Sequence, residues 1–188
     1  MMRWRGPFIA LCITALAGTG AMAGLDALDR AYAPTLDAPV VSTEVVARDG
    51  ALLRSLATPE GAWRFKISLD DVDPRFLDML ISYEDKRFFE HRGVDPFAIM
   101  RAATQLMTNG RIISGGSTIT MQLARLMEPR SERSITAKLR QIARALQIER
   151  RLSKHQILER YLTLAPYGGN LEGVRAASLA WYGKEPKR

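Results

Sequence analysis

A cluster of ionisable and aromatic side chains lies between residues 83 and 93. Two carboxylic acids, Glu84 and Asp85, are followed within eight residues by three basic residues, a histidine and two phenylalanines: Lys86, Arg87, Phe88, Phe89, His91 and Arg92. A carboxylate whose pKa is tuned by nearby cations is what acid–base chemistry on an anionic substrate requires. The same composition also fits a solvent-exposed helix end, so the composition leaves both interpretations open.

A second segment with chemical potential is Ser114-Gly115-Gly116-Ser117-Thr118. Backbone amides, two hydroxyl groups and an expected helix N-terminus coincide there, which is an arrangement that binds anions such as phosphate. The alternative is a plain loop with a serine at the helix N-cap. A P-loop is excluded because the glycines are not followed by Lys-Ser or Lys-Thr.

The positive charge is concentrated in the second half of the chain. Residues 1–100 carry 11 Lys/Arg against 14 Asp/Glu, a net charge of −3, whereas residues 101–188 carry 16 against 6, a net charge of +10. Arg125, Arg133 and Lys138 belong to this basic half, and their alternative is a solvated helix face. Nucleic acid, small phosphate-bearing molecules and anionic lipid headgroups would each suit such a charge.

Few residues could bind a metal or act as a nucleophile. His91 and His155 are the only histidines, so any metal would have to use carboxylates or the phosphates of a substrate. Cys12 is the only cysteine, which excludes an intrachain disulfide. There is no Gly-x-Ser-x-Gly motif to mark a nucleophilic serine.

The first 25 residues predict a membrane anchor or export signal. Arg3 and Arg5 precede an almost uncharged apolar run from Gly6 to Leu25. Ala21-Met22-Ala23 resembles a signal-peptidase site, but the run is also long enough to span a bilayer, and we favour an uncleaved anchor. The rest of the chain would then lie outside the inner membrane, and nucleic acid becomes an improbable partner.

Behind this segment the sequence predicts a linker, a small β element and a mainly helical domain. Prolines mark residues 26–39 as the linker. In residues 40–69, two β-branched or apolar runs flank the Asp49-Gly50 turn and predict a hairpin, with a further short strand at residues 63–67.

From residue 70 onward the pattern is helical. Asp73-Pro74 and Asp95-Pro96 each open a helix, the first leading to Glu84 and the second running from Phe97 to Thr108. Three further helices are predicted after Thr118, after Ser134 and after the capping box that Ser153 forms with Gln156.

Taken together, the segments resemble the peptidoglycan glycosyltransferases, that is, glycosyltransferase family 51, the amino-terminal module of class A penicillin-binding proteins. The resemblance runs from about Asp70 to the end of the chain, and its details look most like the 1C subgroup. Three motifs in matching order carry it: Glu84-Asp85-x-x-Phe88-x-x-His91-x-Gly93, then Gly116-Ser117-Thr118-Ile119-Thr120-x-Gln122, then Lys154-x-x-Ile157-Leu158-Glu159-x-Tyr161-Leu162.

The resemblance implies a lysozyme-like helical fold on the periplasmic face of a bacterial inner membrane. It also implies polymerisation of lipid II into glycan strands with release of undecaprenyl pyrophosphate. Glu84 would be the general base, with Asp85 beside it. Phe88 and His91 would shape the cleft. The remaining family positions would bind the substrate: Gly116, Ser117, Thr118, Gln122, Arg125, Arg133, Lys138 and Gln141.

The resemblance also implies a divalent cation, Mg²⁺ or Mn²⁺, bound mainly through the substrate's pyrophosphate. Other cell-wall synthesis proteins are expected as partners. The chain departs from the family at Gln141, where a second glutamate is usual, because glutamine cannot ionise. It also ends before the family's last helices and any transpeptidase domain, so we expect an incomplete glycosyltransferase domain over residues 70–188.

Two other functions share some of these features. A lysozyme-like hydrolase or lytic transglycosylase has the same fold and a catalytic glutamate, but it does not need the cations Arg125, Arg133 and Lys138 to bind a pyrophosphate. A non-catalytic, membrane-bound binding module is suggested by Gln141 and the early end. A nucleic-acid binder is disfavoured because aromatic residues do not alternate with the basic ones.

Overall fold

The computed structural model describes residue 20 and residues 23–109, 116–129 and 134–187. The chain divides into a unit of residues 1–35 and a larger unit of residues 36–188. In the first unit, residues 23–31 are helical. No helix in the described part of the chain has the length and apolar character to cross a bilayer. Most of the expected anchor, residues 1–19 and 21–22, lies outside the described residues.

The predicted hairpin is confirmed. Strands β1 (Thr43–Val46) and β2 (Leu52–Leu56) pair antiparallel, with an irregularity between Val45 and Val46. The turn between them is closed by the Asp49 carboxylate, which accepts a hydrogen bond of 3.1 Å from the Ala51 amide. The third predicted strand is shorter than expected: β3 covers only Trp63–Arg64 and pairs in parallel with β4 (Leu171–Glu172), not with the hairpin.

The five predicted helices of the larger unit are confirmed, and their caps explain their starting points. α2 (Pro74–Glu84) has proline at its first position and the Asp73 side chain as its cap. α3 (Pro96–Asn109) begins where the Asp95 carboxylate accepts the amides of Phe97 and Ala98 at 2.9 and 3.1 Å. These carboxylates satisfy amide groups that have no partner within the helix.

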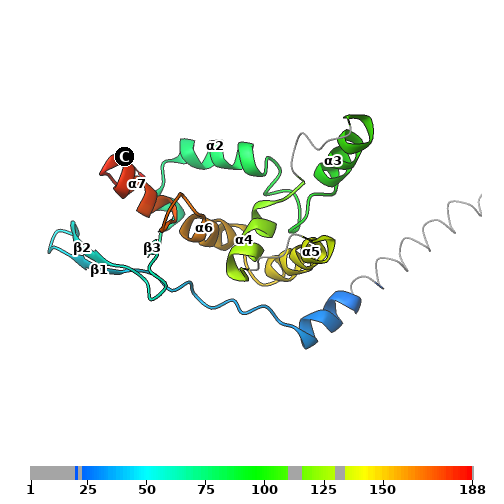
Figure 1. Ribbon diagram of the computed structural model, residues 1–188, viewed down its shortest axis with the longest axis horizontal. Helices are drawn as coiled ribbons and strands as arrows, with labels where there is room; N and C mark the ends of the chain where they lie inside the picture. The colour runs from blue at the N-terminus through cyan, green and yellow to red at the C-terminus, as the bar shows by residue number, and fades with distance from the viewer. Residues whose placement is uncertain (1–19, 21–22, 110–115, 130–133, 188) are drawn as a thin grey trace, which may run out of the picture. The chain divides into compact units, whose positions relative to one another are not determined.

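The next three helices also begin at hydroxyl caps. Thr118 caps α4 (Ile119–Met127), Ser134 caps α5 (Ile135–Glu149), and Ser153 forms the predicted capping box with Gln156 at the start of α6 (Lys154–Leu164). Figure 1 shows α4 between α5 and α6, and α4 contacts both of them.

The sequence did not predict the helical residues 23–31, which overlap the expected linker, the 3₁₀ turn η1 (Leu69–Asp71), the strand β4 or the helix α7 (Val174–Tyr182). α7 lacks the usual signal because its N-cap is Gly173, which makes no side-chain bond. Gly173 has φ +85°, and a Cβ there would lie 2.6 Å from the Thr163 carbonyl oxygen. This position therefore requires glycine for a close approach of two backbones.

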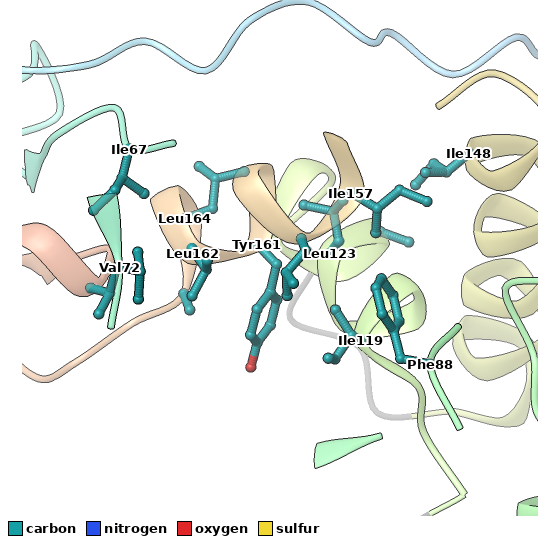
Figure 2. Close-up of a cluster of buried hydrophobic side chains, with 14 residues drawn as sticks. Ile67, Val72, Phe88, Ile119, Leu123, Ile148, Ile157, Tyr161, Leu162 and Leu164 are labelled. Atoms are coloured by element: carbon teal, nitrogen blue, oxygen red, sulfur yellow. The ribbon is translucent and has the colours of Figure 1, made fainter. Parts of the chain in front are cut away.

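The core of the larger unit is built around α4 and α6. Ile119 and Leu123 of α4 pack with Ile157, Leu158 and Leu162 of α6. Figure 2 labels all of these except Leu158, together with Phe88 and Ile148. Full burial of one such side chain contributes roughly 1.5–3 kcal/mol. The cluster fixes α4 and α6 against each other, and both helices carry residues of the candidate site.

Candidate active site

The two adjacent acids of the first cluster point in different directions. Glu84 is the last residue of α2, and Asp85 is its C-cap with a non-helical backbone, φ −160° and ψ 73°. Because the helix ends between them, the two side chains do not follow one helical face. Glu84 is partly exposed, whereas Asp85 is 7% exposed and lies in the interior.

Glu84 belongs to a chain of three hydrogen-bonded side chains from three helices. The Gln122 amide Nε2 of α4 donates to Glu84 Oε2 at 2.8 Å. The Tyr161 hydroxyl of α6 donates to Gln122 Oε1 at 3.2 Å. The structure therefore brings Glu84 and Gln122 together as a bonded pair and adds Tyr161, to which we assigned no role from the sequence.

The negative charge of Glu84 contributes to the raised pKa of two tyrosines. Burial, with the nearby Glu84 carboxylate, raises the pKa of Tyr161 to about 12. Burial and the same carboxylate also raise the pKa of Tyr167, which lies between α6 and β4. Both phenols are therefore protonated at neutral pH and available as hydrogen-bond donors.

Asp85 forms a separate, closed network. Its carboxylate accepts from His91 Nε2 at 2.9 and 3.0 Å and from the Ile119 amide at 2.9 Å. Ile119 is the first residue of α4, so Asp85 ties the end of α2 to the beginning of α4. His91 is 8% exposed and Phe88 is completely buried, with their rings packed edge to face. These three motif residues lie in the interior behind Glu84.

The segment before α4 makes several bonds within the protein. The Thr118 hydroxyl accepts the Met121 amide at 3.1 Å and donates to the Gly93 carbonyl at 2.6 Å. The Ser117 hydroxyl receives a hydrogen bond of 2.6 Å from Lys138 Nζ. Gly116 lies against α3, since a Cβ there would be 3.6 Å from the Ala98 carbonyl oxygen. Ser117 is therefore connected to the basic helix α5, while Thr118 serves mainly as the cap of α4.

A cavity of about 890 Å³ lies along α4 and α5. Arg125, Lys138 and Gln141, three residues expected to bind substrate, are among those that line it. Burial, together with the positive charge of Arg125, holds the pKa of Lys138 below its usual range. Two cations crowded in this way favour an anion beside them.

Three further arginines in the cavity wall were not assigned to the site from the sequence. Arg64 and Arg144 pair with Glu172 and Glu128, while Arg140 follows Lys138 by two residues on α5. Arg64 comes from the β element, far away in sequence, which explains why helical spacing gave no signal for it. Arg133, which we also expected in this group, lies outside the described residues.

The described residues contain no group of three or more His, Cys, Asp or Glu side chains that could hold a metal ion. The carboxylates nearest to the site are engaged separately. Asp85 is bonded to His91 and Ile119, and Glu128 is paired with Arg144.

Comparison with known proteins agrees with the family expected from the motifs. A family model described as "Transglycosylase" matches residues 49–188. The chain is 52% identical to penicillin-binding protein 1C of Escherichia coli strain K12 over 142 residues, which are 76% of this chain and 18% of that protein. It is 40% identical to penicillin-binding protein 1A of Pseudomonas aeruginosa over 147 residues, 78% of this chain and 18% of that protein.

A more distant relative shows the same pattern. Penicillin-binding protein 1A of Aquifex aeolicus is 36% identical over 146 residues, 78% of this chain and 20% of that protein. The chain thus spans about a fifth of the length of these curated relatives. Since the family model covers most of the chain, the expected family is confirmed, and the chain belongs to the transglycosylase family.

Proposed function

We propose that this chain is a peptidoglycan glycosyltransferase with a lysozyme-like fold that polymerises lipid II into glycan strands, with Glu84 as the general base. The observation that carries the proposal is the position of Glu84. It is a partly exposed carboxylate held by Gln122, and Gln122 lies on the helix that also supplies Arg125 to the basic cavity. A base next to an anion site suits a substrate that carries a pyrophosphate leaving group.

In the proposed reaction, the Glu84 carboxylate takes the proton from the 4-hydroxyl group of the acceptor's N-acetylglucosamine. The resulting oxygen nucleophile attacks C1 of the donor's N-acetylmuramic acid and forms the new glycosidic bond with inversion. The bond between C1 and the pyrophosphate oxygen breaks, and undecaprenyl pyrophosphate leaves with the bonding electron pair. The hydrogen bond from Gln122 holds the Glu84 carboxylate in place for this step.

Negative charge develops on the pyrophosphate as its bond to C1 breaks. Arg125 and Lys138 line the cavity and can stabilise that charge. Arg140, two residues after Lys138 on α5, adds a third cation to the lining. The lining also includes the apolar side chains of Leu126, Ile135 and Leu164, which suit the first part of a lipid tail. Gln141 can form hydrogen bonds to a sugar or phosphate but contributes no charge.

A divalent cation would be held mainly by the substrate and not by a metal site of the protein. The residues that the structure describes form no metal site of their own, so Mg²⁺ or Mn²⁺ would be held mainly by the pyrophosphate oxygens of the substrate. There it would supply additional positive charge to the leaving group. The chemistry assigned to Glu84, Arg125 and Lys138 does not require it.

The location and partners follow from the same proposal. The apolar run from Gly6 to Leu25 would anchor the chain in the bacterial inner membrane, with the domain on the periplasmic face beside its lipid substrate. Other cell-wall synthesis proteins would be its partners.

The test is an assay of the detergent-solubilised 188-residue chain with labelled lipid II and Mg²⁺. We expect glycan polymer from the unchanged chain and at least a ~100-fold lower rate from Glu84→Gln, because general-base catalysis typically contributes 10²–10⁴-fold. Glu90→Gln is the matched control, since Glu90 is an exposed carboxylate in the same segment. Equal rates for Glu84→Gln and Glu90→Gln would overturn Glu84 as the base, and shortening of preformed glycan would indicate a hydrolase instead.

A further inference from the structure

We infer that Tyr161 is a positioning residue whose hydroxyl group fixes the orientation of the Gln122 amide, so that Gln122 always presents an N–H group to Glu84. The inference rests on the proposed function, in which Glu84 must be ionised to act as a base. It concerns a residue that does not touch the substrate and acts only through Gln122.

The direction of the hydrogen bonds carries the argument. An ionised carboxylate can only accept hydrogen bonds, so the group that faces Glu84 at 2.8 Å must be the NH₂ of Gln122. The carbonyl oxygen of the same amide then faces Tyr161 at 3.2 Å. A carbonyl oxygen can only accept, so Tyr161 must donate. In this orientation of the amide both groups of Gln122 and the hydroxyl hydrogen of Tyr161 are satisfied at the same time.

The reversed amide suits the other protonation state of Glu84. In that orientation the Gln122 carbonyl faces Glu84, which can satisfy it only by carrying a proton. The Tyr161 oxygen could then accept from the Gln122 NH₂, but its own hydrogen would lose its acceptor, because Gln122 Oε1 is the only acceptor for it in the part of the chain that the structure describes. A hydroxyl without an acceptor in a buried position is costly. Tyr161 thus disfavours protonated Glu84.

The tyrosine is held by the core and not by the site. Tyr161 is 7% exposed, and its ring packs within the apolar cluster of α4 and α6. Figure 2 shows the ring beside Leu123, with the hydroxyl oxygen pointing out of the cluster. Because α4 and α6 are fixed by this packing, the hydroxyl is in place before any substrate binds.

Other charged or titratable groups also lie around Glu84. Asp85 follows it but turns into the interior, and Tyr167 contributes a second protonated phenol beyond the end of α6. Arg125 acts on Tyr161 from α4, and Lys138 lies close to Arg125 from α5. Tyr161→Phe leaves all four of these groups unchanged and removes only one hydroxyl, so it isolates the orientation of the amide.

The experiment compares the unchanged chain with Tyr161→Phe, using the complete 188-residue protein in detergent. The rate of glycan polymerisation is measured from pH 4.5 to 9. We expect the acid limb of the profile to move to higher pH by roughly 0.5 to 1 unit in Tyr161→Phe, because one neutral hydrogen bond no longer opposes protonation. Tyr182→Phe is the control, since Tyr182 is exposed on α7, and its profile should stay unchanged.

A second measurement is independent of activity. The ¹³C NMR shift of the Glu84 carboxyl carbon, assigned with Glu84→Gln, is followed through a pH titration without substrate. The same upward shift is expected in Tyr161→Phe. If neither the NMR titration nor the acid limb moves, the inference is overturned, even where Glu84→Gln abolishes activity and the proposed function holds. If Glu84→Gln remains as active as the unchanged chain, the proposed function fails, and the NMR titration still decides the role of Tyr161.

Discussion

Glu84 and Asp85 are neighbours with the same functional group, yet they belong to two different regions of the molecule. On the closed side, Asp85 is buried and accepts hydrogen bonds from His91 and from the first amide of α4. On the open side, Glu84 is partly exposed and bonded to a single side-chain amide, that of Gln122. The end of α2 between them sends one carboxylate into the core and leaves the other bonded to Gln122, on the helix that supplies Arg125 to the basic cavity.

This difference separates stability from chemistry at adjacent positions. Removing a carboxylate whose acceptor sites are occupied by buried donors leaves those donors without partners. A carboxylate with one partner and access to solvent can exchange protons with a substrate. Asp85 is therefore expected to stabilise the fold that presents Glu84, and Glu84 to perform the reaction.

The strongest test of this division is Asp85→Ala. It leaves the Ile119 amide and the His91 ring nitrogen buried without an acceptor, so we expect a loss of roughly 2–4 kcal/mol in the free energy of unfolding. Urea unfolding followed by circular dichroism measures it. Glu84→Ala is the matched control, with an expected change below about 1 kcal/mol, because Glu84 is partly exposed and its partner Gln122 keeps its bond to Tyr161. A loss for Glu84→Ala equal to that for Asp85→Ala would contradict the division.

The open side is tested next by Lys138→Gln. Lys138 lines the cavity and is crowded by Arg125, so removing its charge should not destabilise the fold. We expect polymerisation to fall by roughly 10- to 100-fold through lost stabilisation of the leaving group. Steady-state kinetics with labelled lipid II measure the effect. Ser117→Ala removes only the hydrogen-bond partner of Lys138, and an equal loss there would show that the contact, and not the charge, matters.

Much of the helical fold could be predicted from the sequence because the signals for helix starts are local. Three helix starts are marked by signals within four residues of sequence: Asp73-Pro74, Asp95-Pro96 and the Ser153 capping box. The structure has helices at these places. α7 was missed because Gly173, which opens it, is required by contact with Thr163, ten residues earlier. A contact of that kind leaves no periodic signal in the sequence.

The open side was harder to predict because its geometry depends on contacts between helices. The motifs pointed to Glu84 and Gln122 separately, but their bond joins residues that are 38 positions apart. From the sequence, Tyr161 could be identified only as a position that matches the family's motif, because its helical spacing is that of any core residue. Arg64 reaches the cavity from a strand that pairs with residues 171–172, which no spacing rule connects to α5.

Asp95 offers a smaller test of whether charge is what makes a buried, hydrogen-bonded carboxylate such as Asp85 stabilise the fold. Like Asp85, it is a buried carboxylate that caps a helix, and it also pairs with Arg87. Burial alone would raise the pKa of Asp95, but the Arg87 guanidinium and the amides of Ala98 and Phe97 outweigh it and hold the pKa below its usual range. A carboxylate with a lowered pKa stabilises the fold above its unfolded pKa of about 4, and this contribution disappears as the pH falls through its folded pKa.

Asp95→Asn keeps a good helix cap and removes the charge. We therefore expect it to be less stable than the unchanged chain by about 1.5 kcal/mol at pH 7, the lower end of the range of hydrogen bonds to a charged partner, with the gap closing as the pH is lowered below about 4. Urea unfolding of both proteins at pH 7 and pH 3 measures the gap. Asp73→Asn at the exposed cap of α2 should show a smaller gap, because its partner Arg75 is 91% exposed. A gap for Asp95→Asn that is the same at both pH values would mean that this carboxylate acts by its shape alone, and that charge does not distinguish the closed side from the open one.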